Sequence, residues 1–389
     1  MRKAAALVTG ILVAGWVGAP ARAADAQVRA RPQPAPATGA VSALDKVGAL
    51  RVRADAGDAA AQLNLGLVYA IGQGVPRDYA EAASWYRKSA EQGNALAQLN
   101  LGWCYALGQG VPRDPAQAAH WYRKAADQRE PTAQLKLGLL YASGEGVPQS
   151  DAEAAVWFRK AAEQGDSTAQ YRLGLAFSQG RGVERDAAQA VAWLRKAAER
   201  GKPAAQFMLG VMFEQGRGVL QNLPEAVAWY RRAAEQEDAT AQLNLGACYE
   251  LGRGVPQDLA QAALWYRRAA EQGEARAQAN LGYAYANGRG VERDYAEAAA
   301  WYRRSADQGN ASAQFDLGDL YAQGLGVPRS LVEAYRWVSL AASRASNAED
   351  RTHFSSARDQ LAAMMTTGDL IEAQQRIREW TAEFESRPR

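Results

Sequence analysis

The sequence is poor in the side chains that most often bind metals or carry out catalysis. Its 389 residues include only two histidines and two cysteines. His120 and His353 have no Cys, Asp or Glu neighbour at the spacing of a metal site. No nucleophile elbow and no phosphate-binding loop with a Gly-Lys-Ser/Thr end is present. We therefore predict no catalytic residues, no cofactor and no metal, and we expect that the protein is not an enzyme.

Long apolar runs are missing everywhere except at the start of the chain. There, Arg2 and Lys3 precede an apolar stretch at residues 4–17, and a small-x-small pattern ends at Ala23. This order is typical of a bacterial secretory signal, and residues 4–17 are too few to cross a bilayer comfortably. We expect cleavage after Ala23, a periplasmic or secreted protein, and no transmembrane segment after cleavage. An uncleaved anchor is the alternative.

The chain also lacks a large excess of either charge. Its 45 basic residues include Arg2, Lys3 and Arg22 of the signal, so 42 basic residues remain against 42 acidic ones after cleavage. A balanced chain has no general attraction for nucleic acid. Nucleic acid is therefore not an expected partner.

What the sequence does contain is a repeat of 36 residues that occurs eight times without insertion or deletion. A glutamine marks the same place in each copy, a glycine follows four residues later, and a tryptophan follows 23 residues after the glutamine. The glutamines are Gln62, Gln98, Gln134, Gln170, Gln206, Gln242, Gln278 and Gln314. Such a period predicts a solenoid in which each unit buries its apolar face against its neighbours.

Each repeat is predicted to hold two helices. The first follows a polar residue such as Asp58 or Asn94 and ends at a glycine such as Gly72, where a left-handed C-cap and a tight turn are expected. The second begins at a polar cap that is followed three residues later by Glu or Gln, the pattern of a capping box. These caps are Asp78, Asp114, Ser150, Asp186, Asn222, Asp258, Asp294 and Ser330.

The remaining constant positions predict the packing. Gly66 and its equivalents allow a close helix approach, and Trp85 and its equivalents are interpreted as core rather than as a ligand cage. Cys104 and Cys248 occupy the same slot four repeats apart. An extended array would separate them by on the order of 40 Å, so we expect buried free thiols. An intermolecular disulfide is the alternative.

The repeats define the organisation of the chain. We predict a signal peptide at residues 1–23, a Pro/Ala-rich linker at 24–41, an N-terminal capping helix at 42–57, eight repeats at 58–345, and a helical cap at 346–389. In that cap we expect helices at 349–364 and 369–384, with Asp369 as a candidate N-cap. The fold class is all-α.

The repeat resembles the Sel1-like repeat, a relative of the tetratricopeptide repeat. The shared pattern A-Q-x-x-L-G-x-x-Y-x-x-G-x-G-V-x-x-D-x-x-x-A-x-x-W-Y-R-K-A-A-x-x-G is well kept at residues 97–129 and 241–273. The resemblance implies a right-handed α-solenoid of helix–turn–helix repeats. It also implies a scaffold or adaptor for protein complexes, many of which lie in bacterial envelopes.

The most variable positions of the first helices form one stripe, which we predict to be concave and to bind a protein or peptide partner. Asn side chains can pair with a peptide backbone, cations can pair with carboxylates, and aromatic rings can act as anchors. The predicted site residues are Asn64, Asn100, Trp103, Lys136, Arg172, Asn244, Asn280 and Tyr283. A stripe that serves only solubility and repeat packing is the alternative.

A second series is basic and runs down the second helices, from Arg87-Lys88 to Arg303-Arg304. It favours an alternative function, an envelope regulator or polysaccharide-associated factor that binds glycan or glycan-handling machinery. However, an acid such as Glu91 follows each pair, so surface ion pairs also explain the series. A hydrolase site built from two carboxylates in the groove is a third alternative.

Overall fold

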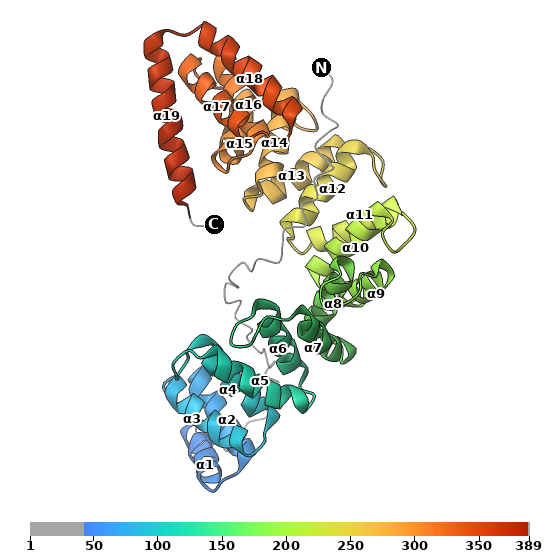
Figure 1. The fold of residues 1–389 in the computed structure, drawn as a ribbon, viewed down its shortest axis with the longest axis vertical. Coiled ribbons are helices and arrows are strands. Elements are labelled where there is room, and N and C mark those ends of the chain that lie inside the picture. The colour runs from blue at the N-terminus through green and yellow to red at the C-terminus, as the bar shows by residue number, and fades with distance from the viewer. Residues whose placement is uncertain (1–42, 388–389) are drawn as a thin grey trace. The chain divides into compact units, whose positions relative to one another are not determined.

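The computed structural model describes residues 43–387, and every regular element among them is an α-helix (Figure 1). The signal and linker predictions lie outside the described residues. The helices are α1 Ala43–Asp55, α2 Ala59–Ile71, α3 Tyr79–Glu91, α4 Ala95–Leu107, α5 Pro115–Asp127, α6 Pro131–Ser143, α7 Asp151–Glu163, α8 Ser167–Gln179, α9 Ala187–Glu199, α10 Pro203–Gln215, α11 Leu223–Ala234, α12 Ala239–Leu251, α13 Leu259–Glu271, α14 Ala275–Asn287, α15 Tyr295–Asp307, α16 Ala311–Gln323, α17 Leu331–Arg344, α18 Ala348–Ala363 and α19 Thr367–Ser386. The predicted all-α fold of tandem helix pairs is confirmed.

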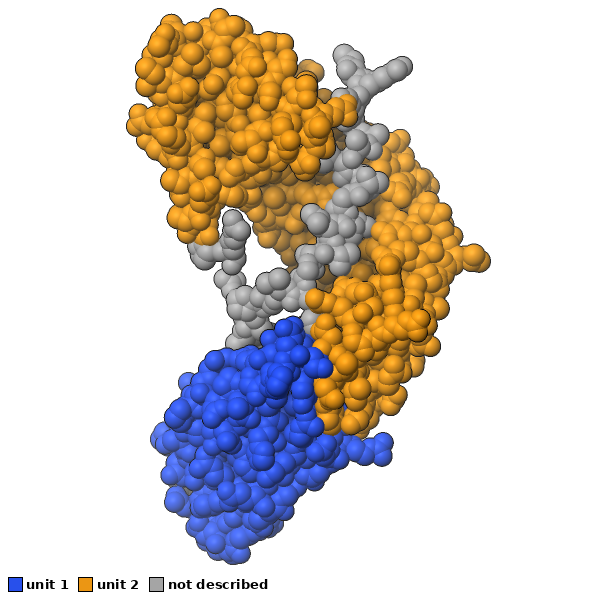
Figure 2. All heavy atoms as spheres, viewed as in Figure 1, with its two compact units in different colours: residues 1–150 blue, residues 151–389 orange. Residues whose placement is uncertain are grey.

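The chain divides into two compact units, residues 1–150 and residues 151–389, which Figure 2 colours separately. Among the described residues, unit 1 holds α1 to α6 and unit 2 holds α7 to α19. Within each unit, a helix packs on the helix before it and the helix after it, as α3 does on α2 and α4. Packing between successive helices is the pattern of a solenoid, and the exception is α19, which packs on α17.

Polar caps fix where the helices begin and end. Asp78 accepts hydrogen bonds from the backbone N–H groups of Ala80 and Glu81 at 2.8 and 3.0 Å. Asp58 caps α2 in the same way, and Gly72 ends that helix in the left-handed conformation with a φ of 78°. The N-cap and C-cap residues predicted for these helices are therefore confirmed.

The predicted capping box is only half formed in these repeats. In a complete box, the acid three residues after the cap would accept a hydrogen bond from the backbone of the cap residue. Glu81 instead accepts a hydrogen bond from the indole N–H of Trp85 at 3.1 Å, and Glu225 accepts one from Trp229 at 2.9 Å. The buried indole N–H needs an acceptor more than the cap backbone does, because the cap lies where water can reach it.

Two glycines of each repeat are required by close packing. A Cβ atom on Gly66 would lie 2.6 Å from the ring of Tyr86, which confirms the predicted close helix approach. A Cβ atom on Gly290 would lie 2.0 Å from the carbonyl oxygen of Leu259, at the start of the preceding second helix. The second glycine of the turn therefore seats one repeat against another, in addition to forming the turn.

The marker glutamines form buried hydrogen-bonded links between repeats. Gln242 donates its side-chain amide to the carbonyl of Ala234 at 3.0 Å. Its Oε1 accepts a hydrogen bond at 2.8 Å from Gln272, which follows the second helix of the same repeat, so the contact to the preceding repeat is the one with Ala234. Each link thus pairs polar groups that burial would otherwise leave unpaired, which explains why the position does not vary.

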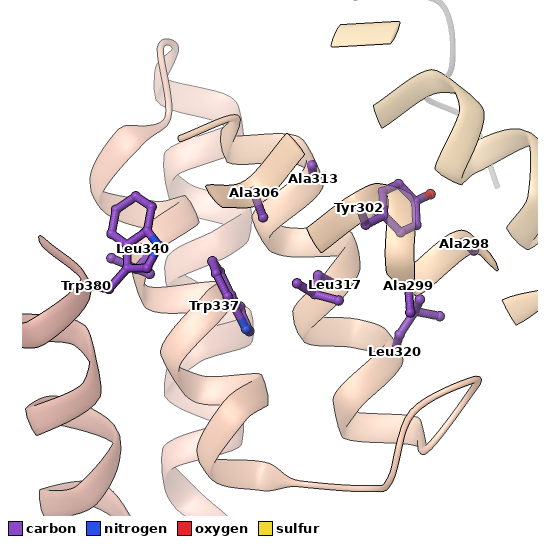
Figure 3. Packing of buried hydrophobic residues seen from close by; sticks show 10 residues of the cluster. All are labelled: Ala298, Ala299, Tyr302, Ala306, Ala313, Leu317, Leu320, Trp337, Leu340 and Trp380. Atoms are coloured by element: carbon purple, nitrogen blue, oxygen red, sulfur yellow. The ribbon is translucent and has the colours of Figure 1, made fainter. Parts of the chain in front are cut away.

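The C-terminal helices cover the last repeat. Trp380 of α19 packs edge-on against Trp337 of α17, with ring centroids 6.2 Å apart (Figure 3). The predicted cap at Asp369 is wrong by three residues. Thr366 is the N-cap of α19, and Asp369 accepts a hydrogen bond from the backbone of Thr366 to complete a capping box. The sequence contains the pattern of this box, but the prediction assigned the N-cap to its acid, Asp369, instead of to its threonine, Thr366.

Candidate partner-binding face

The predicted stripe is a surface of the first helices in unit 1. On α2, Asn64, Leu67 and Ile71 are all exposed. On α4, Trp103 and Leu107 are exposed and Asn100 is half-buried. These residues share one side of each helix because their spacing follows the helical period.

Lys136 of α6 joins this surface through Trp103. Its ammonium nitrogen lies 4.6 Å from the centroid of the Trp103 ring, within the range of a cation–π contact. The structure therefore brings Trp103 and Lys136 into contact, and it leaves Asn64 exposed on α2 and Asn100 half-buried on α4. Their role in binding stays a prediction.

The four predicted site residues in unit 2 are half-buried, and three of them contact their own unit in ways that serve packing. Asn244 donates to the backbone carbonyl of Thr240 at 2.8 Å. Tyr283 packs against the core of α15 to α17, and Arg289 lies over its ring. Asn280 interacts with the hydroxyl of Tyr266. Arg172 is half-buried on α8.

Two members of the predicted stripe are core residues instead. Leu175 of α8 and Val211 of α10 occupy the positions equivalent to Leu67, but they are only 7% and 3% exposed. Their neighbours Ala176 and Met212 are also buried, so α8 and α10 are enclosed on more sides than α2. On α8 and α10 this position therefore serves packing, which agrees with the alternative interpretation of the stripe there.

Sequence reasoning missed a set of carboxylates held by tyrosines in unit 2. The hydroxyl of Tyr230 donates to Glu214 at 2.7 Å, and Arg253 of the next repeat contacts the same carboxylate at 3.1 Å. Tyr266 and Arg289 hold Glu250 in the same manner. The sequence does contain a signal for this set, because Glu214 and Glu250 replace the alanine that most other repeats have at the same position. A search for the most variable positions did not include this one.

Asp316 of α16 is a related acid without an arginine partner. It hydrogen-bonds the hydroxyl of Tyr302, and the carboxylate of Asp319 lies close enough to act on its charge. Burial raises the pKa of Asp316 to about 7, and the charge of Asp319 raises it further against the lowering effect of the Tyr302 bond. This carboxyl group therefore titrates near neutral pH.

The basic series of the second helices contacts aromatic rings. Arg87 donates to the hydroxyl of Tyr105 at 2.8 Å, and Lys88 lies 3.7 Å from the ring centroid of Trp85. Arg231 and Arg232 repeat both contacts in unit 2. The structure thus gives these cations aromatic partners. These contacts indicate that the basic side chains help to pack the helices of the repeats against one another.

Both cysteines are buried free thiols, as the sequence predicted. Burial raises the pKa of Cys104 to about 11 and that of Cys248 to about 12. Since the thiolate is the reactive form, we expect neither thiol of the native protein to react with a thiol reagent such as Ellman's reagent at pH 8. Both should react once urea unfolds the chain. Rapid reaction of one thiol in the native state would support the intermolecular disulfide instead.

Within residues 43–387, no helix has both the length and the apolar content needed to cross a bilayer. Within the same range, no three His, Cys, Asp or Glu side chains come together as metal ligands would.

Comparison with known proteins gives a single family. The model of the Sel1 repeat matches eight segments, which are residues 59–94, 95–129, 131–166, 167–202, 203–238, 239–274, 275–310 and 311–346. A solved Sel1 repeat protein from Oxalobacter formigenes is 37% identical, with a TM-score of 0.62, and the match covers 84% of this chain and 97% of that one. A protective antigen of uropathogenic Escherichia coli strains is 30% identical, with a TM-score of 0.56, and the match covers 87% of this chain and 95% of that one. No curated protein matches the chain.

Proposed function

Because this chain belongs to the Sel1 repeat family, whose fold typically mediates protein–protein interaction, we propose that it is a non-catalytic scaffold or adaptor. It binds a protein or peptide partner on the exposed side of its first helices. The observation that carries this proposal is the exposure of large apolar side chains on α2 and α4, where folding alone would favour polar ones.

The arrangement of polar groups supports binding over catalysis. Glu214 and Glu250 are held by tyrosine and arginine, and the basic series is held by aromatic rings. These bonds account for these charged groups as part of the packing. The amides of Asn64 and Asn100, in contrast, form no side-chain hydrogen bond that involves only described residues, and they stand beside exposed apolar side chains. A peptide backbone can satisfy such amides.

We further propose that the protein acts in the bacterial envelope, as a periplasmic or secreted protein. The support is the signal-like sequence of residues 1–23, with its basic start and its small-x-small end. Fractionation of cells that express the full chain tests this directly. A processed protein in the periplasmic or secreted fraction is expected, and an unprocessed protein in the cytoplasm would contradict the proposal.

The function is tested by cross-linked capture from a native envelope extract. The bait is the wild-type chain or the variant Asn100→Ala/Trp103→Ala/Asn244→Ala. We expect a protein partner that the wild type retains and the variant loses. The fold should persist, because Trp103 is exposed and Asn100 and Asn244 are half-buried polar residues outside the hydrophobic core. A control variant, Val156→Ala/Leu264→Ala, removes exposed apolar side chains from the second helices α7 and α13.

Three results would contradict this assignment. Equal loss of the partner in both variants would mean that binding is not located on the first helices. Retention of the partner by both variants would place the site elsewhere on the chain. Recovery of glycan without any protein partner would favour the envelope factor that binds polysaccharide.

A further inference from the structure

Exposed apolar side chains are concentrated on two first helices of unit 1. The residues Leu67, Ile71, Leu96, Trp103 and Leu107, which we call the apolar face, are between 36% and 69% exposed and all lie on α2 and α4. No two of the other exposed large hydrophobic residues in the described part of the chain share a helix, and these are Val52, Val156, Leu220, Leu251, Leu264, Met364 and Ile371. A concentration of this kind marks a binding surface.

The two helices present this face together. Trp103 of α4 occupies the repeat position of Leu67 of α2, and Leu107 occupies that of Ile71 in the same way. The contact of Lys136 of α6 with Trp103 shows that the first helices of successive repeats meet on this side. The face therefore spans at least two repeats, at about 10 Å for each neighbouring helix.

Charged side chains of both signs flank α2 and α4 in the sequence, so charge does not select what covers the apolar face. Those between residues 58 and 115 are the acids Asp58, Asp78, Glu81, Glu91 and Asp114 and the bases Arg77, Arg87, Lys88 and Arg113. Lys136 adds one base, but its contact with Trp103 and a further interaction already engage it. We therefore expect an occupant that binds mainly through apolar contacts and carries little net charge.

The chain itself contains such a segment immediately before α1. Residues 24–42 precede the described part of the chain, and their charged side chains are those of Asp25, Arg29 and Arg31. The middle of the segment is the run PQPAP at residues 32–36. Proline-rich runs favour the polyproline II helix, whose backbone carbonyls have no internal hydrogen bonds, and such helices bind surfaces lined by aromatic side chains. Trp103 provides an exposed ring of this kind.

The segment enters α1 at the level of the apolar face. Gln62, near the start of α2, donates to the carbonyl of Ala54 at 3.0 Å. Arg51, one turn earlier in α1, donates to the hydroxyl of Tyr69, near the end of α2, at 3.4 Å. The two helices are therefore antiparallel, and since each has 13 residues, the start of α1 is level with Ile71.

The proline run lies at a suitable distance along the chain to reach the face. Pro36 and Pro32 precede Ala43 by 7 and 11 residues, which corresponds to about 22 to 34 Å at about 3.1 Å per residue of polyproline II helix. Crossing from α1 past α2 to α4 takes about two helix diameters, or about 20 Å. A segment tethered in this way has an effective concentration on the order of 1 mM, so a contact with a dissociation constant of only about 0.1 mM keeps the face about 90% covered.

We propose that residues 24–42 bind back onto the apolar face and cover it until a protein partner displaces them. This inference rests on the proposed function and names the regulation of the same site in unit 1. The proline rings pack on Trp103, Leu107 and Ile71. The amides of Asn64 and Asn100 donate to the backbone carbonyls of the segment.

The test is fluorine NMR of the full chain with fluorinated tryptophan and a spin label on Gln33→Cys. Trp103 reports on the apolar face, because it is 39% exposed and every other tryptophan among the described residues is buried. The label reacts with the new thiol, since both native cysteines are buried. We expect the label to weaken the Trp103 signal about fivefold compared with the reduced label, because a contact that is about 90% formed keeps the label close to the ring. An unchanged Trp103 signal would overturn the proposal.

Variants separate a bound segment from one that is merely nearby. Pro32→Ser/Pro34→Ser/Pro36→Ser keeps the length of the segment but removes its proline rings, so it should restore most of the Trp103 signal. An equal loss of signal in this variant and in the wild type would overturn the proposal, because the tether alone would then bring the label near.

A second pair of variants tests the face itself. Ile71→Ser/Leu107→Ser removes two apolar side chains but keeps Trp103 as the reporter, and it should also restore the signal. The matched control is Val52→Ser of α1, since Val52 is 71% exposed and Ile71 is 69% exposed. Restoration of the signal by Val52→Ser as well would overturn the proposal.

Mixing distinguishes the chain's own segment from that of a second copy. A spin-labelled chain without fluorine is mixed with a fluorinated chain without label, and we expect no loss of the Trp103 signal. A loss in the mixture equal to that within one chain would assign the apolar face to a second copy and would overturn the proposal.

The outcome is distinct from that of the capture experiment. If the label leaves Trp103 unchanged but the chain captures a protein partner through its first helices, the scaffold function stands and the covering segment is wrong. The triple proline variant should also capture the partner at about a tenfold lower concentration of bait than the wild type, because only about a tenth of the wild-type face is uncovered. Equal capture by the two would overturn the proposal.

Discussion

Gly290→Ala is expected to lower the free energy of unfolding of unit 2 by about 4 kcal/mol, a loss that few single substitutions produce. Two effects combine. A left-handed backbone costs a residue with a Cβ about 1–2 kcal/mol, and Gly290 has a φ of 75°. The new Cβ would also lie 2.0 Å from the carbonyl oxygen of Leu259, so the two repeats must move apart. Urea unfolding followed by circular dichroism measures the loss.

The preceding repeat provides a control for the backbone effect alone. Gly273 has a φ of 94°, but a Cβ atom on it would have no neighbour within 4 Å. Gly273→Ala should therefore cost only about 1–2 kcal/mol. Since neighbouring repeats stabilise one another, Gly290→Ala should also broaden the unfolding transition, and Gly273→Ala should not. Equal losses in the two variants would mean that the close contact between repeats does not hold Gly290 in place.

Asp316→Asn is expected to stabilise the protein at pH 8 by about 4 kcal/mol more than at pH 4. Burial raises the pKa of Asp316 to about 7 from an ordinary value of 3.8. The folded state therefore prefers the protonated acid, whose contribution to stability is complete below pH 4 and is lost as the pH rises to about 7. Each unit of pKa difference corresponds to about 1.4 kcal/mol. Asparagine avoids this loss because it stays uncharged.

The sequence itself suggests that asparagine fits this position, because Asn64, Asn100, Asn244 and Asn280 are its equivalents in four other repeats. Thermal melts of the wild type and the variant between pH 4 and pH 8 measure the effect. Asp319→Asn is the comparison, since it removes only the neighbouring charge and should give a smaller gain at pH 8. A stability difference between Asp316→Asn and the wild type that does not change with pH would show that Asp316 ionises normally.

The fold followed from the sequence because the repeat constrains it eight times. Caps such as Asp78, the C-cap Gly72 and the close approach at Gly66 depend on neighbours within one repeat, so a local pattern is enough to predict them. The all-α class and the order of helix pairs needed nothing more. The Trp85 position was predicted as core for the same reason, and it is buried.

The side-chain contacts within a repeat were less accessible to sequence reasoning. The indole of Trp85 and the carboxylate of Glu81 have compatible spacing on one helix, but the capping box used the same acid and was the simpler interpretation. The link from Gln62 to Gln92 joins residues thirty positions apart, a separation that no helical period indicates. Such a pair becomes visible only when the two helices of a repeat are packed together.

The candidate site, like the fold, could be predicted from the sequence only in part. Helical spacing identified the positions that share one side of α2 and α4, and these are exposed. Spacing could not show that Leu175 and Val211 at equivalent positions are buried, because burial depends on neighbours outside the helix. Spacing also gave no reason to distinguish the first helices α2, α4 and α6, which contain no acid, from α16, which contains Asp316 and Asp319.

Site-specific photo-crosslinking in the native envelope extract tests the central claim that the first helices bind a protein partner. A photoreactive phenylalanine replaces Leu107 on α4 or, in the control, Leu264 on α13, which are 51% and 42% exposed. We predict a protein adduct from position 107 and no adduct from position 264. Adducts from position 264 alone, or equal adducts from both positions, would contradict the account.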